Sequence, residues 1–285
     1  MSSKMQSLPV TITLTRYREP DWLVDECLDS LAVQERVRGE VIFLDQNWRP
    51  DYAQAVEARS TDALKFSCLP CEERGICYAR NRGIELSTNK FAIQVDPDVI
   101  LPPLWSHTML LSLTHEGAAI AGSKIVPKWR GRPPLLTRSR IVMDQYSMLD
   151  WGDDTKSVGR IVSAAFAMDI EQYREQLFFN ENYGRREGVL FSGAETELCG
   201  RLRKIGAKVI YVGSAILEHQ VLQGRLNWAW PLKRLYYAGA SRRQSGGVPA
   251  PSRKPGPWDY LLLPIILPPY LAGYFFGPRP SSETE

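Results

Sequence analysis

Two aspartates one residue apart, Asp96 and Asp98, are the side chains in this sequence that are best suited to chemistry. The apolar run 91–95 directly precedes them and predicts a buried strand that ends at the pair. Carboxylate oxygens in a tight turn can face a divalent cation and a diphosphate together, and Pro97 stiffens that turn. Because Asp and Pro also favour ordinary strand-to-loop turns, a turn without chemistry is the competing interpretation.

A third carboxylate, Asp45, is expected at the same edge of the predicted sheet. Hydrophobic runs predict strands that alternate with helices, at 10–14, 41–44, 64–69 and 91–95. This order implies parallel strands joined by right-handed crossovers, and ligands of such sheets bind outside the carboxyl ends of the strands. Asp45 and Asp96 each follow a strand, so we expect both at this ligand-binding edge.

The second half of the chain predicts more strands and one clear helix. Strands are expected at 118–126, 161–168 and 208–212, and a helix at 195–205. Between them, residues 127–159 form a long stretch of weak periodicity that is rich in arginine and contains two tryptophans. Long inserts of this kind are often functional, so we expect an acceptor-binding or lid segment, against the simpler alternative of a solvated loop.

The run GICYARNRGI at 75–84, followed by the strand and aspartate pair at 91–98, resembles the signature of family 2 glycosyltransferases of the GT-A fold. The resemblance continues over 10–31, 40–45, 193–202 and 208–219. It implies an α/β fold in which a mixed, mainly parallel, Rossmann-like sheet is flanked by helices. The catalytic domain would cover 1–224, with a nucleotide-binding half at 1–126 and an acceptor half at 127–224.

The resemblance also implies roles for five side chains of the donor site. Asp45 matches the family position that hydrogen-bonds the nucleotide base, and Arg80 matches one near the base or ribose. Asp96 matches the first acid of the DxD motif, at the ribose or donor sugar, and Asp98 matches the second, on Mg²⁺ or Mn²⁺. His219 matches a histidine near the metal and diphosphate. The competing interpretations are a solvated helix charge for Arg80 and a structural role for His219.

The resemblance places the candidate general base at the start of the helix at 195–205. The family generally has a Glu-Asp pair there, whereas this chain has Ala194 and Glu195. Glu195 is the candidate that would accept the proton of the acceptor hydroxyl, with Glu197 and Glu187 as substitutes. The alternative is a capping box, in which Ser192 caps the helix and Glu195 bonds back to its amide.

These residues support the hypothesis of an inverting transferase that moves a single sugar from a nucleotide-sugar to a hydroxyl of a glycan or lipid-linked acceptor. The Gln-x-x-Arg-Trp element of processive synthases is not evident. The base of the donor is not predicted, because 46–48 read Gln-Asn-Trp where a second Asp and Gly-Ser are common. A sugar-nucleotide nucleotidyltransferase is the less favoured rival, because 15–20 contain no glycine. A non-catalytic scaffold with the same fold remains the second alternative.

The C-terminal part has a different composition from the catalytic domain. Residues 225–254 carry seven Lys or Arg and no acid, and 258–276 are almost wholly apolar but contain three prolines. We expect a basic amphipathic helix at 225–247, then a Pro-rich linker and an apolar segment within 248–285. The apolar segment would attach to a membrane as a hairpin or interfacial wedge beside the basic helix, which favours anionic lipid.

Composition limits the partners and the compartment. The net charge is only +3 and the basic residues are concentrated in one segment, which argues against a nucleic-acid partner. The N-terminus has no apolar stretch of signal-peptide length, so we expect a cytoplasmic protein that is peripheral on the cytosolic face of a membrane. The sequence predicts no oligomeric state.

Overall fold

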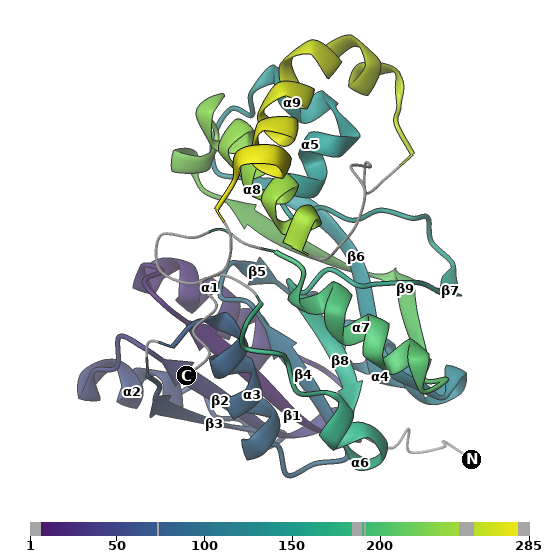
Figure 1. Ribbon diagram of the computed structural model, residues 1–285. Coiled ribbons are helices and arrows are strands. Elements are labelled where there is room, and N and C mark those ends of the chain that lie inside the picture. The colour runs from purple at the N-terminus through teal and green to yellow at the C-terminus, as the bar shows by residue number, and fades with distance from the viewer. Residues whose placement is uncertain (1–6, 73, 184–189, 191, 245–253, 279–285) are drawn as a thin grey trace, which may run out of the picture.

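The computed structural model describes residues 7–72, 74–183, 190, 192–244 and 254–278. Its centre is a nine-stranded sheet in the order β3-β2-β1-β4-β8-β6-β9-β5, with β7 paired to β9 (Figure 1). Helices cover both faces of this sheet, and a pair of C-terminal helices lies at one end of the molecule. The expected mixed α/β sheet is therefore confirmed.

The N-terminal half alternates strands and helices as predicted. Its elements are β1 (Leu8–Arg16), α1 (Asp21–Ala32), β2 (Val37–Asp45), α2 (Pro50–Glu57), β3 (Leu64–Pro70), α3 (Ile76–Leu86) and β4 (Phe91–Val95). The four strands are parallel, and the register sets Arg16 opposite Asp45 and Leu14 opposite Val95. The carboxyl ends of β1, β2 and β4 therefore meet at one edge.

The second half adds antiparallel pairing. Its elements are β5 (Val99–Ile100), α4 (Trp105–Glu116), β6 (Ala118–Trp129), η1 (Leu135–Arg138), α5 (Arg140–Gln145), β7 (Thr155–Ser157), β8 (Ala165–Asp169), α6 (Ile170–Tyr173), η2 (Arg174–Gln176), α7 (Ala194–Lys204), β9 (Lys208–Val221) and η3 (Gln223–Arg225). Strand β8 runs antiparallel between β4 and β6, while β6 and β9 are parallel. Parallel pairing is thus confined to β1–β4 and to the β6–β9 pair.

Several predicted elements have different bounds in the structure; the strand expected at 208–212, for example, extends to Val221 in β9. The strand expected at 161–168 begins only at Ala165, because 163–164 form a turn, although the carbonyl of Ala164 still accepts from the amide of Asp96 at 2.8 Å. The weakly periodic stretch at 127–159 contains η1, α5 and β7 and the end of β6. It is therefore more structured than a solvated loop.

The two faces of the sheet bury separate apolar clusters. Val10, Ile12 and Leu14 of β1 point toward α1 and α4, whereas helices α3, α6 and α7 cover the other face. On that second face, Thr13 approaches Gly83 of α3 so closely that a Cβ there would lie 2.8 Å from the threonine hydroxyl. The sheet is thus covered on both sides, with α3 and α7 on the same side.

The C-terminal region folds into two long helices, α8 (Ala229–Gln244) and α9 (Pro257–Phe276), that pack on each other and on α5 (Figure 1). Their backbones touch at two glycines: a Cβ on Gly239 would lie 2.0 Å from the carbonyl of Tyr270, and one on Gly273 would lie 1.7 Å from that of Tyr236. Large side chains are therefore excluded from this contact.

The alternative of a hairpin inside the apolar segment is wrong, because α9 is one helix of 20 residues that passes through Pro264, Pro268 and Pro269. Proline removes backbone donors and bends a helix, but packing against a neighbouring helix can hold the bent form. Among the described residues, α9 is the one helix that length and composition would allow to cross a membrane.

Candidate active site

The turn between β4 and β5 holds the aspartate pair at the predicted edge. Strand β5 pairs with β9 so that Val99 faces His219, which brings His219 Nε2 to 3.3 Å from Asp98 Oδ1. Arg225, in η3 after β9, places Nη1 3.3 Å from the other carboxylate oxygen of Asp98. Both Asp98 and His219 are buried. The structure thus joins two predicted metal ligands and adds a cation.

The pair Asp98 and His219 has the chemistry of a divalent-cation site. The carboxylate suits both Mg²⁺ and Mn²⁺, whereas the imidazole departs from the oxygen ligands that Mg²⁺ prefers and so favours Mn²⁺; in nucleotide enzymes such ions take further ligands from water and substrate phosphates. The described residues contain no group of three or more His, Cys, Asp or Glu that would hold a metal by themselves. Asp98 and His219 therefore fit a metal whose coordination a diphosphate completes.

Arg80 joins the candidate base to the carboxyl-end edge of the sheet, which is called the donor edge below because the sequence predicts the donor there. Its Nη2 donates to Asp96 Oδ1 at 3.0 Å, and its Nη1 donates to Glu195 Oε1 at 3.0 Å. The guanidinium is 4% exposed, whereas the two carboxylates are 26% and 22% exposed. The interpretation of Arg80 as a solvated helix charge is therefore wrong.

Ser163 completes this group of side chains. Its hydroxyl accepts from Arg80 Nη2 at 2.9 Å and donates to Glu195 Oε1. The guanidinium of Arg80 also lies over the rings of Phe166 and Phe179, at 5.8 and 5.4 Å from their centroids. Arg80, Asp96, Ser163 and Glu195 are called the open cluster below.

Glu195 lies in the first turn of α7, and the capping box expected as its alternative role is absent. The N-cap is Gly193, at φ 117°, and no side chain caps this helix. Burial alone would raise the pKa of Glu195, but the charge of Arg80 and the hydrogen bond from Ser163 outweigh it and hold this pKa below its usual value. The carboxylate is therefore ionised and can accept a proton.

The two substitutes for the base have different outcomes. Glu197 Oε1 instead accepts from Arg201 Nε at 2.7 Å, one helical turn further on. Glu187 lies outside the residues that the structure describes. Glu195 is thus the described acid of this helix that contacts the donor edge.

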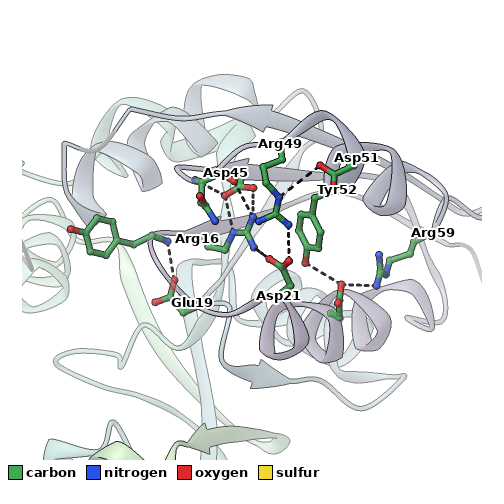
Figure 2. Close-up of polar contacts among 11 residues, drawn as sticks. Arg16, Glu19, Asp21, Asp45, Arg49, Asp51, Tyr52 and Arg59 are labelled. Carbon is green, nitrogen blue, oxygen red and sulfur yellow. Dashed lines mark hydrogen bonds and ion pairs between the residues drawn. The ribbon is translucent and has the colours of Figure 1, made fainter.

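Asp45 ends β2 at the expected edge, but its carboxylate is not accessible to a ligand. Arg16 donates to both of its oxygens, from Nε at 2.8 Å and from Nη2, and neither side chain has exposed surface. Arg16 also reaches Asp21, whose second oxygen accepts from Arg49 (Figure 2). These four residues are called the closed cluster below. A hydrogen bond from a nucleotide base to Asp45 would require Arg16 to move, so that role stays a prediction.

A cavity of about 880 Å³ opens beside the open cluster. One part of its wall is formed by Arg80, Asp96, Ser163 and Glu195, and α5 contributes Ile141, Asp144 and Gln145. The remaining wall comes largely from α7, α8 and α9. Part of the long insert therefore lines a space next to the candidate base, as an acceptor-binding segment would.

Three residues of these sites were not singled out from the sequence. Arg225 was visible only as one of the basic residues that follow β9, and Arg16 only as the end of the first strand. Ser163 was hidden inside a predicted strand. Their roles depend on strand register and on the late start of β8, which a single sequence does not specify.

Comparison with known proteins identifies the family. The model of glycosyl transferase family 2 matches residues 12–161, which include the open cluster's Arg80 and Asp96 and the buried pair Arg16 and Asp45. The chain belongs to this family.

Two relatives share about a quarter of their residues with the chain. A glucosyl-dolichyl phosphate glucuronosyltransferase of Haloferax volcanii is 25% identical over 180 residues, which cover 60% of this chain and 56% of the relative. A pre-mycofactocin glycosyltransferase of Mycobacterium tuberculosis is 24% identical over 174 residues, which cover 59% of this chain and 34% of the relative. The chain thus spans between a third and just over half of the length of these relatives.

A solved structure supports the fold. The crystal structure of GalNAc-T7 with UDP, GalNAc and Mn²⁺ superposes with a TM-score of 0.60 at 11% identity, over 84% of this chain and 51% of that one. The similarity confirms the expected GT-A architecture.

Proposed function

We propose that this protein is a glycosyltransferase that moves a single sugar, with inversion, from a nucleotide-sugar to a hydroxyl of a lipid-linked acceptor. The observation that carries the proposal is the open cluster: Arg80 links the donor-edge carboxylate of Asp96 to Glu195 on the wall of a large cavity. Family membership and the GT-A fold support the same reaction class.

The donor would bind at the carboxyl ends of β1 and β4, where Asp96 faces the ribose or sugar. Asp98 and His219 would hold Mg²⁺ or Mn²⁺, which supplies charge neutralisation at the diphosphate. Arg225 lies against Asp98 and would place a second cation near the same leaving group. The structure of GalNAc-T7 likewise contains Mn²⁺ together with UDP and GalNAc.

In the transfer step, the acceptor hydroxyl oxygen attacks the anomeric carbon and forms the new glycosidic bond. The bond from that carbon to the diphosphate breaks, and the nucleoside diphosphate leaves with the electron pair. Glu195, ionised because Arg80 and Ser163 lower its pKa, takes the hydroxyl proton. A single displacement inverts the anomeric configuration.

The lipid-linked acceptor is supported by the C-terminal helices. Several large side chains on the outer face of α9 are exposed to solvent. The exposed fractions of Tyr260, Leu261 and Phe276 are 66%, 67% and 83%. Such a face suits the interfacial region of a bilayer, and the basic residues of α8 would attract anionic headgroups. The name of the Haloferax relative also places its acceptor sugar on a lipid phosphate. We infer a peripheral protein on the cytosolic face of a membrane.

The donor side is tested with Asp98→Ala. With a panel of nucleotide-sugars and Mn²⁺, this variant should lose metal-dependent turnover by more than about a hundredfold, because a buried metal ligand is removed. It should also lose the thermal stabilisation that donor and Mn²⁺ give together to the wild type. Asp153→Ala, which removes an exposed acid that pairs with Lys124, is the matched control. An active, metal-independent Asp98→Ala variant would refute the assignment.

The membrane side is tested with point changes in the full chain. The double variant Leu261→Glu/Phe276→Glu should no longer float with anionic liposomes. The control Val33→Glu, at an exposed apolar residue directly after α1, should float as the wild type does. Equal flotation of all three proteins would contradict the membrane role of α9. A non-catalytic scaffold predicts donor binding and flotation without transfer.

A further inference from the structure

Arg225 and Asp98 form an ion pair at the place where the metal is proposed to bind. Arg225 Nη1 lies 3.3 Å from Asp98 Oδ2, and His219 Nε2 lies 3.3 Å from Asp98 Oδ1, so each carboxylate oxygen already faces a nitrogen. A divalent ion bound to Asp98 would lie next to the guanidinium, and neighbouring like charges repel each other. Metal and guanidinium therefore compete for the same acid.

The side chain of Arg225 is held less tightly than that of Arg80. It is 28% exposed and reaches Asp98 at 3.3 Å, whereas Arg80 is 4% exposed and donates to two carboxylates at 3.0 Å. An ion pair that involves a long, partly exposed side chain contributes little to stability. The guanidinium of Arg225 can therefore leave Asp98 without disrupting the fold.

The backbone of Arg225 is, by contrast, fixed by two aromatic residues. Tyr146, which follows α5 and is buried, donates from its hydroxyl to the carbonyl of Arg225 at 3.0 Å. Trp230 of α8 stacks on Tyr146 with the ring centroids 4.5 Å apart, and its ring centroid lies 5.9 Å from the guanidinium carbon of Arg225. The side chain of Arg225 can therefore move while its backbone stays in place beside Asp98.

A diphosphate would offer the displaced guanidinium a new partner. In nucleotide enzymes, Mg²⁺ and Mn²⁺ are shared between protein carboxylates and phosphate oxygens, so a diphosphate on a metal at Asp98 would lie beside Arg225. A guanidinium matches phosphate oxygens in geometry and charge and can donate two parallel hydrogen bonds to them. Arg225 would thus gain charged hydrogen bonds only when metal and donor are both present.

From this arrangement we propose that Arg225 couples the binding of the metal to the binding of the donor. In the free protein its guanidinium neutralises Asp98, and once Asp98 binds Mn²⁺ the guanidinium moves to the diphosphate. Arg225 therefore weakens the binding of the metal alone and strengthens the binding of the diphosphate when the metal is present, so that each ligand raises the affinity for the other. Tyr146 and Trp230 are positioning residues that act through Arg225. This inference rests on the proposed function and adds the residue that links its two ligands.

The first experiment measures the binding of Mn²⁺ alone. Full-length protein in a neutral detergent is titrated with Mn²⁺, and the loss of the EPR signal of the free ion gives the Kd. Arg225→Gln should bind Mn²⁺ at least about fivefold more tightly than the wild type, because the competing cation is removed. A damaged fold would weaken binding, so a gain in affinity cannot come from misfolding. Affinity of Arg225→Gln equal to or below that of the wild type overturns the proposal.

Two control variants show whether this gain is specific to Arg225. Lys128→Gln removes a cation that pairs with Glu218, the neighbour of His219 in β9, and should bind Mn²⁺ as the wild type does. Arg225→Gln combined with Asp98→Ala should lose the gain, because the metal ligand is absent. A similar gain in Lys128→Gln, or a gain that survives in the double variant, would make the effect one of net charge and overturn the proposal.

The second experiment adds a diphosphate. UDP, GDP, ADP and CDP are each titrated by calorimetry with Mn²⁺ in excess, and the one that the wild type binds best is used with the variants. Arg225→Gln should raise its Kd about tenfold, because a charged hydrogen bond to the diphosphate is lost, and Arg225→Lys should recover part of the affinity. An ion pair that stays on Asp98 predicts no change, and an unchanged or lower Kd in Arg225→Gln overturns the proposal.

A pair of variants in α8 tests the positioning role. Trp230→Leu removes the ring beside the guanidinium and should shift both affinities in the same directions as Arg225→Gln, by about two- to threefold. Trp230→Phe keeps an aromatic ring and should bind both ligands as the wild type does. If Trp230→Leu changes neither affinity, or weakens the binding of both ligands, the positioning role is refuted.

The wild type distinguishes this inference from the proposed function. Wild-type protein that binds none of the four nucleoside diphosphates in the presence of Mn²⁺ refutes the proposed function. Wild-type protein that binds one of them and turns over the corresponding nucleotide-sugar, while Arg225→Gln binds both ligands as the wild type does, refutes the coupling alone.

Discussion

The closed and open clusters share a buried arginine at their centre and differ in how accessible the central acid is. In each, a buried arginine lies over two aromatic rings and binds carboxylates from separate elements: Arg16 over Phe43 and Tyr52, and Arg80 over Phe166 and Phe179. The main carboxylate of the closed cluster, Asp45, has no exposed surface, whereas both carboxylates of the open cluster face the cavity. Access to the acid, rather than the ion pair, separates a structural pair from a candidate site.

The comparison predicts different outcomes for replacing an acid in the two clusters: loss of activity in the open cluster and loss of stability in the closed one. Glu195→Gln keeps the shape of the side chain and removes the basic oxygen, so kcat for transfer should fall by about 10²–10⁴-fold. Its thermal unfolding should stay close to that of the wild type. The control is Glu197→Gln, which should stay active. Glu197 lies two residues after Glu195 in α7 and pairs with Arg201. If Glu195→Gln were fully active and Glu197→Gln inactive, the general base would be Glu197 rather than Glu195.

Replacing the buried acid of the closed cluster should lower the stability of the fold. Asp45→Ala leaves the buried guanidinium of Arg16 without its main partner, so the free energy of unfolding should fall by about 3–5 kcal/mol in urea titrations. The double change Arg16→Met with Asp45→Leu should restore most of this loss, because it removes both buried charges. An Asp45→Ala protein as stable as the wild type would show that the pair is not structural.

The pH profile tests how Arg80 acts on the base. The pKa of Glu195 lies below its usual value, so the acid limb of kcat/KM should fall below about pH 4.3, the ordinary value for Glu. Arg80→Met removes the charge that lowers this pKa, and the limb should move to higher pH. Arg82→Met, which removes a cation of the same helix that pairs with Glu85 at 2.8 Å, should leave the limb in place. An unmoved limb in Arg80→Met would exclude Glu195 as the titrating group.

The same pKa shift has a consequence for stability. A lowered folded-state pKa means that the ion pairs of Glu195 stabilise the fold above the unfolded pKa, and that this contribution is lost as the pH falls through the folded value. The loss should be smaller in Arg80→Met, which has no cation to pair.

The smallest effect is expected at the rim of the closed cluster. Asp21 is 41% exposed and binds Arg16 and Arg49 at 2.6 Å each. Asp21→Asn should lower the free energy of unfolding by less than about 1 kcal/mol, and added salt should reduce the difference further. A loss of stability as large as that of Asp45→Ala would mean that the contribution of these ion pairs does not depend on how exposed they are.

The sequence predicts the donor edge well because strand ends are marked by a change from apolar to acidic residues. The pattern at 91–98 places Asp96 and Asp98 correctly, and the same logic places Asp45. The partner of Asp45 is not predictable in this way, since Arg16 lies 29 residues away and meets it only through the parallel register of β1 and β2.

The other differences also depend on tertiary contacts. Ser163 belongs to an apolar run that predicts a strand, yet it lies in a turn before β8, where its hydroxyl accepts from Arg80. Three prolines in α9 favour a break, but the close glycine contacts with α8 are made along one continuous helix. Propensity is local, whereas these outcomes are decided by neighbours that are distant in the sequence.

The glycine contact between α8 and α9 also bears on the distance between Glu195 and a membrane surface. At Gly239 and Gly273 the two backbones meet without intervening side chains, so a shift of α9 along α8 would bring larger side chains into a contact that has no space for a Cβ. Helix α8 in turn holds the segment before Glu195 through Ser241 and Arg234. In a membrane-bound protein, the depth of α9 in the lipid would therefore set the distance between the membrane surface and the sugar at Glu195, through rigid helix contacts rather than a flexible linker.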